Sequence, residues 1–142
     1  MATKRFLVPV DGSEYAMRAL RYAIGRARES QAEIHVLHVE PPPLYQEARL
    51  YAMREDIARI HQEAHQRLLQ DAVAELQQAG VPHASHLTEG EVANAIAQFA
   101  DSQRMDEIIM GTRGMTAFGQ MLMGSVASRV VHFVKIPVTL LK

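Results

Sequence analysis

The sequence contains no cysteine among its 142 residues. Disulfides, thiolate metal sites and cysteine nucleophiles are therefore all excluded. No hydrophobic run approaches the roughly 18 residues that a membrane-spanning helix needs. Residues 1–5 are polar and lead into a short apolar run without the apolar region of a signal peptide. We therefore expect a cytoplasmic protein with no membrane span.

A large charge of either sign is also missing. The chain has 15 basic and 16 acidic residues, for a formal net charge of −1. A nucleic-acid-binding protein would show a basic excess or stripe, so we expect no nucleic-acid partner. Any anionic ligand must be held by local groups. Hydrophobic residues at 48% and charged residues at 22% are typical of a globular protein, and the length predicts one domain over residues 1–142.

Short apolar runs alternate with amphipathic segments along the chain. Strands are expected at 5–10, 33–39, 83–88, 106–110 and 138–141. Helical patterns begin at Glu14, extend over roughly 46–79, follow Gly90, and lead from Val126 to Val134. Pro9 lacks a donor for the ladder, but it lies near the end of its strand. This alternation predicts an α/β fold with a mostly parallel sheet and helices on both faces.

The segment from Gly111 to Ser125 combines glycines with the start of a helix. Glycine lets backbone amides approach a ligand closely, and a helix N-terminus offers unpaired N–H groups to a phosphate. The Ser125 hydroxyl can cap the helix or donate to a phosphate oxygen. The plainer alternative is that the glycines shape a turn and Ser125 only caps. A P-loop is excluded because Gln120 stands where lysine is required.

Gly111, Gly114, Gly124 and Ser125 form the pattern G-2x-G-9x-G-[ST], which resembles the ATP-binding signature of universal stress proteins. The resemblance covers the whole chain through further blocks, namely 7–13, 38–39, 108–114, 124–127 and 136–138. It implies a Rossmann-like fold, similar to the adenine nucleotide α-hydrolases, with an open five-stranded parallel sheet in the order 3-2-1-4-5. In such a sheet Asp11 and Gly111 would meet at the switch point where ligands bind.

The resemblance also implies which residues would hold ATP. The adenosine side would consist of Pro9, Val10, Asp11, Val39, Met110 and Gly111, and the phosphate side of Gly114, Gly124, Ser125 and Val126. The Asp11 carboxylate would accept from adenine or ribose, and the Val39 backbone would meet adenine. Arg113 would either contact a phosphate or point to solvent. Mg²⁺ or Mn²⁺ would be held mainly by the phosphates.

Three histidine pairs are interpreted as structural. His61 and His65 have metal-ligand spacing, but H-Q-E-A-H is not the zincin motif H-E-x-x-H, which favours a solvated helix face. The pairs His35–His38 and His83–His86 have odd spacing on strands, so the members of each pair face opposite sides and cannot chelate together.

The leading interpretation is an ATP-binding regulatory module that hydrolyses ATP slowly at most and acts on an unidentified protein partner. No positioned base, P-loop lysine or acidic pair indicates a fast enzyme. Two alternatives stay open: an interaction module that binds no nucleotide, and an enzyme that transfers or hydrolyses adenylate. The turn at 11–13 matches the Ser-Gly-Gly-x-Asp-Ser loop of such enzymes only in part. The resemblance further implies a homodimer through residues 138–141.

Overall fold

The computed structural model describes residues 2–42, 55–113 and 123–142. Within these ranges the chain forms five strands and four helices. In chain order they are β1 (Arg5–Pro9), α1 (Glu14–Ser30), β2 (Glu33–Glu40), α3 (Glu55–Ala79), β3 (His83–Glu89), α4 (Val92–Ser102), β4 (Glu107–Gly111), α5 (Ser125–Phe133) and β5 (Val138–Leu141).

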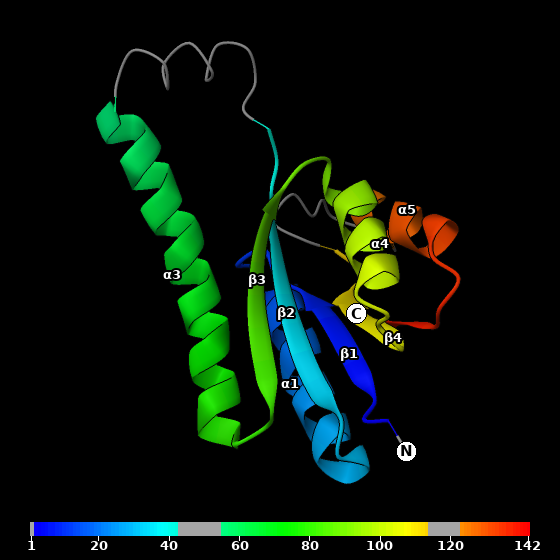
Figure 1. Ribbon diagram of the computed structural model, residues 1–142. Helices are drawn as coiled ribbons and strands as arrows, with labels where there is room; N and C mark the ends of the chain where they lie inside the picture. The colour runs from blue at the N-terminus through cyan, green and yellow to red at the C-terminus, as the bar shows by residue number, and fades with distance from the viewer. Residues whose placement is uncertain (1, 43–54, 114–122) are drawn as a thin grey trace.

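The strands form one parallel sheet in the order β3-β2-β1-β4-β5. This confirms the strand order implied by the family resemblance. Helices cover both faces of the sheet, α1 and α3 on one side and α4 and α5 on the other (Figure 1). The direction of the strand order changes between β1 and β4, so β1 is the centre of the sheet and the switch point lies at its carboxyl end.

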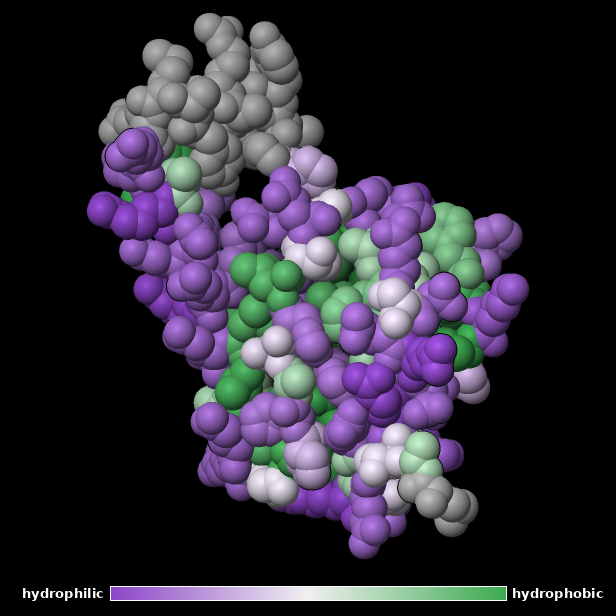
Figure 2. Space-filling view, viewed as in Figure 1, coloured by the Kyte–Doolittle hydropathy of each residue, from purple (hydrophilic) through white to green (hydrophobic). Residues whose placement is uncertain are grey.

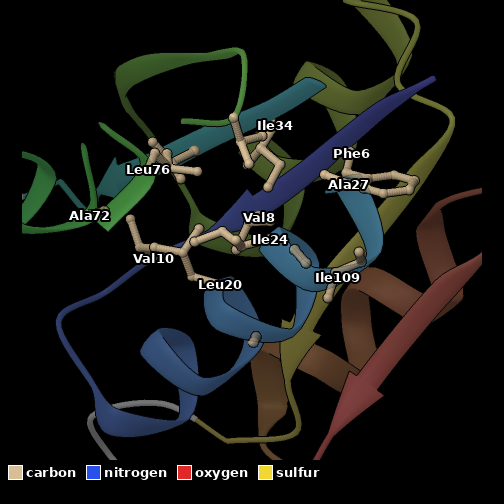
Figure 3. Packing of buried hydrophobic residues seen from close by; sticks show 14 of the residues in the cluster. Phe6, Val8, Val10, Leu20, Ile24, Ala27, Ile34, Ala72, Leu76 and Ile109 are labelled. Carbon is tan, nitrogen blue, oxygen red and sulfur yellow. The ribbon is translucent and has the colours of Figure 1, made fainter. Parts of the chain in front are cut away.

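Side-chain alternation along the strands divides the buried residues into two cores. Phe6 and Val8 of β1 pack with α1 and α3, whereas Leu7 packs with α4 and α5. Figure 3 shows the first core, in which Val8 and Val10 lie beside Leu20 of α1. Both faces of a parallel sheet are buried, which explains the continuous apolar run of β1 and the fully buried centre of β2.

The first turn of the chain shows why β1 ends where it does. Pro9 is the last residue of β1 and lies opposite Leu37, so its missing donor falls at the end of the ladder as expected. The Val10 N–H then donates to the Leu37 carbonyl at 2.9 Å. Ser13 is the N-cap of α1, and its hydroxyl accepts from the Ala16 N–H at 3.1 Å.

The helix expected over roughly 46–79 is described from Glu55 to Ala79, and the first residues of the expected range lie outside the described part of the chain. Along this helix the surface is mostly hydrophilic (Figure 2). Among the described residues no helix has the length and apolarity needed to cross a membrane.

Candidate functional site at the carboxyl end of the sheet

The carboxyl ends of β1, β2 and β4 bring several of the predicted site residues to one edge of the sheet. Because the strands are parallel and adjacent, Pro9, Val39 and Gly111 all lie at or near that edge. Gly124 and Ser125, at the start of α5, are joined to it by a hydrogen bond of 2.6 Å from the Gly124 N–H to the Thr112 carbonyl. Gly114 lies outside the described residues.

The carboxylate of Asp11 is fixed by the turn that follows β1. Its Oδ1 accepts from the Ser13 N–H at 2.9 Å, and the residue is half-buried. Gly12 adopts φ of +85°, a conformation that favours glycine, and the position of a Cβ there would lie 3.1 Å from Leu68 Cδ1 of α3. This turn therefore holds a single oriented carboxylate beside the switch point, with α3 packed over the adjoining glycine.

An apolar wall lies on the side of the sheet that α4 and α5 cover. Val39 and Met110 are each 6% exposed and belong to the core on that side. Met123 and Val126 are partly buried and pack against the same core. The wall is suited to a flat apolar ring system such as a nucleobase, because small-molecule sites are mostly apolar with a few placed polar groups.

Val10 differs from the other predicted adenosine contacts. Its side chain is buried in the core formed with α1 and α3, on the opposite face from Val39 and Met110. Its carbonyl accepts from His38 Nδ1–H at 2.8 Å. The described contacts therefore give Val10 an anchoring role in the strand end, with both backbone polar groups bound to β2.

The start of α5 resolves the ambiguity over Ser125. The N-cap is Gly124 with extended backbone, Ser125 is the first helical residue, and no side chain among the described residues caps the helix. Ser125 is exposed. Its hydroxyl is therefore not the cap, and within 2–42, 55–113 and 123–142 no capping side chain satisfies the N–H groups in the first turn of α5. Such a turn, with the positive end of the helix dipole, is suited to an anion.

Gly111 has a packing role that the sequence pattern did not identify. A Cβ at this position would lie 2.8 Å from Tyr15 Cβ and 3.1 Å from the Arg113 carbonyl oxygen. Real Cβ atoms do not approach so closely, so only glycine lets the end of β4 pack against the start of α1. The plainer interpretation of this glycine, a shape requirement, holds at Gly111 whether or not a ligand binds.

Arg113 is half-buried and lies on the α1 side of the sheet edge. It lines a hollow there together with Arg18 and Lys142. Val39 and Met110 are on the other side.

Sequence reasoning missed a histidine pair beside the site. His38 Nε2 lies 2.6 Å from His65 Nδ1, and His65 Nε2 lies 3.4 Å from Glu40 Oε1. His65 is half-buried, so it does not belong to a fully solvated face as expected. Burial lowers the pKa of His38. In the described part of the chain no group of three or more histidine or acidic side chains is arranged to hold a metal ion.

The profile of the Universal stress protein family matches residues 2–142. The chain belongs to the universal stress protein family. Universal stress protein MJ0531 of Methanocaldococcus jannaschii is 32% identical over 139 residues, which span 98% of this chain and 82% of that protein. This outcome confirms the family that the glycine signature indicated.

Solved structures agree with the fold of this universal stress protein. The structure of hypothetical protein MJ0577 superimposes with a TM-score of 0.86 at 25% identity, covering 100% of this chain and 97% of the other. A universal stress protein from Archaeoglobus fulgidus in complex with dAMP has a TM-score of 0.71 at 26% identity and covers 100% of both chains.

Proposed function

We propose that this universal stress protein is a regulatory module that binds an adenine nucleotide, with ATP as the ligand. The observation that carries the proposal is the start of α5. No described side chain caps it, and a hydrogen bond from the Gly124 N–H to the Thr112 carbonyl holds it at the end of β4. An apolar wall and one oriented carboxylate lie at the same edge of the sheet. The similar Archaeoglobus fulgidus protein in complex with dAMP supports an adenine nucleotide.

In the proposed complex the nucleobase lies against the wall formed by Val39 and Met110, next to Pro9. The Asp11 carboxylate accepts a hydrogen bond from a ribose hydroxyl or from adenine. The phosphates lie at the N-terminus of α5 and accept from the N–H groups of Ser125 and Val126, and Gly114 contributes to the same phosphate site. A Mg²⁺ or Mn²⁺ ion is bound mainly by the phosphate oxygens.

We further propose that hydrolysis is slow at most and that the nucleotide state is read by a protein partner in the cytoplasm. Binding is separable from turnover because the sequence has Gln120 in place of the lysine that a P-loop uses to polarise the β- and γ-phosphates. Nucleotide binding would then act by changing the surface that this edge of the sheet presents to the partner.

The test is a charge introduced at the first residue of α5. Ser125→Asp places a carboxylate where the helix dipole favours it, so the helix should be kept or slightly stabilised. The same carboxylate repels phosphate, and we expect ATP affinity to fall by roughly tenfold or more, equivalent to about 1.4 kcal/mol. Isothermal titration calorimetry with ATP, ADP and AMP measures this and ranks the nucleotides.

Ser128→Asp is the matched control, because Ser128 is exposed on the same helix but one turn further on. ATP affinity should change by less than about threefold in this variant, since the dipole effect and the contact are confined to the first turn. No ATP binding by the unmodified protein at millimolar nucleotide would overturn the proposal and favour an interaction module that binds no nucleotide.

A further inference from the structure

A hollow of about 280 Å³ lies at the carboxyl ends of β4 and β5, on the side of the sheet that α1 covers. The described residues that line it are Tyr15, Arg18, Thr112, Arg113 and Lys142. Its volume is close to the lower limit of about 300 Å³ for small-molecule sites. It therefore has room for a small ligand.

Three independent contacts hold the walls of the hollow in place. The close approach of Gly111 to Tyr15 joins the end of β4 to α1. The Thr112 N–H donates to the Leu141 carbonyl at 2.8 Å, which joins β4 to β5 next to Lys142. The Arg18 guanidinium lies over the Tyr15 ring, 4.9 Å from its centroid, and this contact positions the cation at the rim.

The chemistry of the lining is strongly one-sided. Three of the five described lining residues carry cationic side chains, and none of the five has a carboxylate side chain. Tyr15 and Thr112 add hydroxyl groups. Guanidinium groups present planar sets of donors that match phosphate oxygens, and lysine adds a compact positive charge. With a net charge of −1 for the whole chain, this concentration of cations is local.

The hollow is separate from the proposed nucleotide wall because the two lie on opposite faces of the sheet. Met110 belongs to the core under α4 and α5, whereas the next residue, Gly111, faces Tyr15 of α1. Thr112 connects the two sites through its peptide groups. Its N–H bonds to β5 beside the hollow, and its carbonyl accepts from the N–H of Gly124, the N-cap of α5.

We propose that this hollow is a second anion site, which binds a small phosphate-bearing ligand between Arg18, Arg113 and Lys142. Through Thr112 a ligand there restrains the N-cap of α5 and so strengthens the binding of phosphate groups at the start of that helix. The coupling is reciprocal, so a nucleotide at α5 also strengthens binding in the hollow.

The test uses pyrophosphate as the probe and follows backbone amide shifts by NMR. In the Ser125→Asp background, where the start of α5 repels phosphate, we expect saturable shifts at Tyr15, Thr112 and Lys142. Arg18→Gln and Lys142→Gln should each weaken pyrophosphate binding by roughly tenfold, because each removes one charge-assisted contact of at least about 1.4 kcal/mol. Arg67→Gln, at an exposed position on α3, should leave the affinity unchanged within about twofold.

Two results would overturn the proposal. One is the absence of saturable shifts at the hollow up to tens of millimolar pyrophosphate, or equal weakening by Arg67→Gln, which would mean diffuse attraction to surface cations. The other is competitive displacement of hollow-bound pyrophosphate by ATP in the unmodified protein, which would assign the hollow to the phosphates of the nucleotide itself. Because the first arm does not need ATP, failure of nucleotide binding would leave the anion site separately testable.

Discussion

A single glycine determines how closely the central sheet approaches its first helix. Gly111→Ala would place a Cβ 2.8 Å from Tyr15 Cβ and 3.1 Å from the Arg113 carbonyl oxygen. The backbone fixes the positions of both atoms. We expect a loss of roughly 1–3 kcal/mol in the free energy of unfolding, as in other overpacked sites. Urea denaturation followed by far-UV circular dichroism measures this. The added methyl group would push the end of β4 away from α1 and would also move Thr112. The NMR signals of the backbone amides around the hollow should therefore change.

Gly25→Ala is the matched control, because Gly25 lies on α1, the helix that Gly111 packs against. A Cβ at Gly25 would meet nothing within 4 Å, and the position is exposed in the interior of α1. We expect this variant to gain about 0.5–1 kcal/mol, because alanine loses less conformational freedom in a helix than glycine does. If Gly111→Ala were as stable as the unmodified protein, the close contact with α1 would not be a constraint.

The sequence predicts where the glycines stand but only part of what they do. The spacing of Gly111, Gly124 and Ser125 indicated the family and the edge of the sheet at which they lie. The contact of Gly111 with Tyr15 joins residues far apart in the chain, and no local pattern encodes it. Whether Ser125 caps α5 was equally undecidable from sequence, because serine is common both as N-cap and in the first turn.

At the scale of elements, β2 carries a histidine on each face, and each has a partner on another element. His35 Nδ1 lies 2.9 Å from His86 Nε2 of β3, with the rings stacked at 5.2 Å. On the other face His38 meets His65 of α3. Spacing within one strand correctly predicted that His35 and His38 face opposite sides. It could not predict the partners, which depend on the register with β3 and on the packing of α3.

Two histidines, buried His38 and half-buried His86, predict how stability depends on pH. Burial lowers the pKa of both His38 and His86. The folded state therefore binds fewer protons than the unfolded state once the pH falls below the ordinary histidine pKa of about 6.5. Stability should be fully present above that pH and should decrease as the pH falls toward 5. The midpoint of urea unfolding, measured at intervals from pH 7.5 to 5, is expected to fall.

Two variants separate this effect from general acid sensitivity. His86→Gln removes one titrating group but keeps an amide beside His35, so its unfolding midpoint should depend less on pH. His132→Gln, at an exposed position on α5, should keep the full dependence. Glu33 does not interfere, because a hydrogen bond from His35 lowers its pKa and its contribution is lost only below the ordinary carboxyl range. Identical profiles for the two variants would contradict the assignment.

For the whole molecule, strand–helix alternation predicts the fold class, and the family resemblance adds the strand order. Both predictions agree with the structure, because the strand–helix pattern and the family motifs favour the same arrangement of strands and helices. The position of the apolar wall that we propose for the nucleobase could be expected from the sequence, since its residues lie at strand ends. The cationic hollow could not, because its charges come from the first helix, the end of β4 and residue 142. Only the folded chain brings them together.

The sheet has two edges, β3 and β5. All four residues of β5 are half-buried, and the strand leaves its outer backbone groups without a neighbouring strand in the described chain. Exposed edges of this kind are sites of association between chains. In agreement with what the resemblance implies, we propose that two copies pair through β5 to form a homodimer.

The alternation of the β4–β5 ladder supplies a variant that tests this pairing. The carbonyls of Pro137 and Leu141 accept from the N–H groups of Ile108 and Thr112. The odd-numbered residues of β5 therefore bond toward β4, and the N–H of Leu140 points to the open edge. Leu140→Pro removes an outward donor and leaves the inward ladder intact. Light scattering at micromolar concentration should then give the monomer mass, with far-UV circular dichroism showing that the fold is kept.

Leu87→Lys, on the β3 edge, should remain dimeric. A monomeric unmodified protein would overturn the homodimer. A dimer that survives Leu140→Pro but not Leu87→Lys would place the interface away from β5, because only pairing through β5 requires the Leu140 donor.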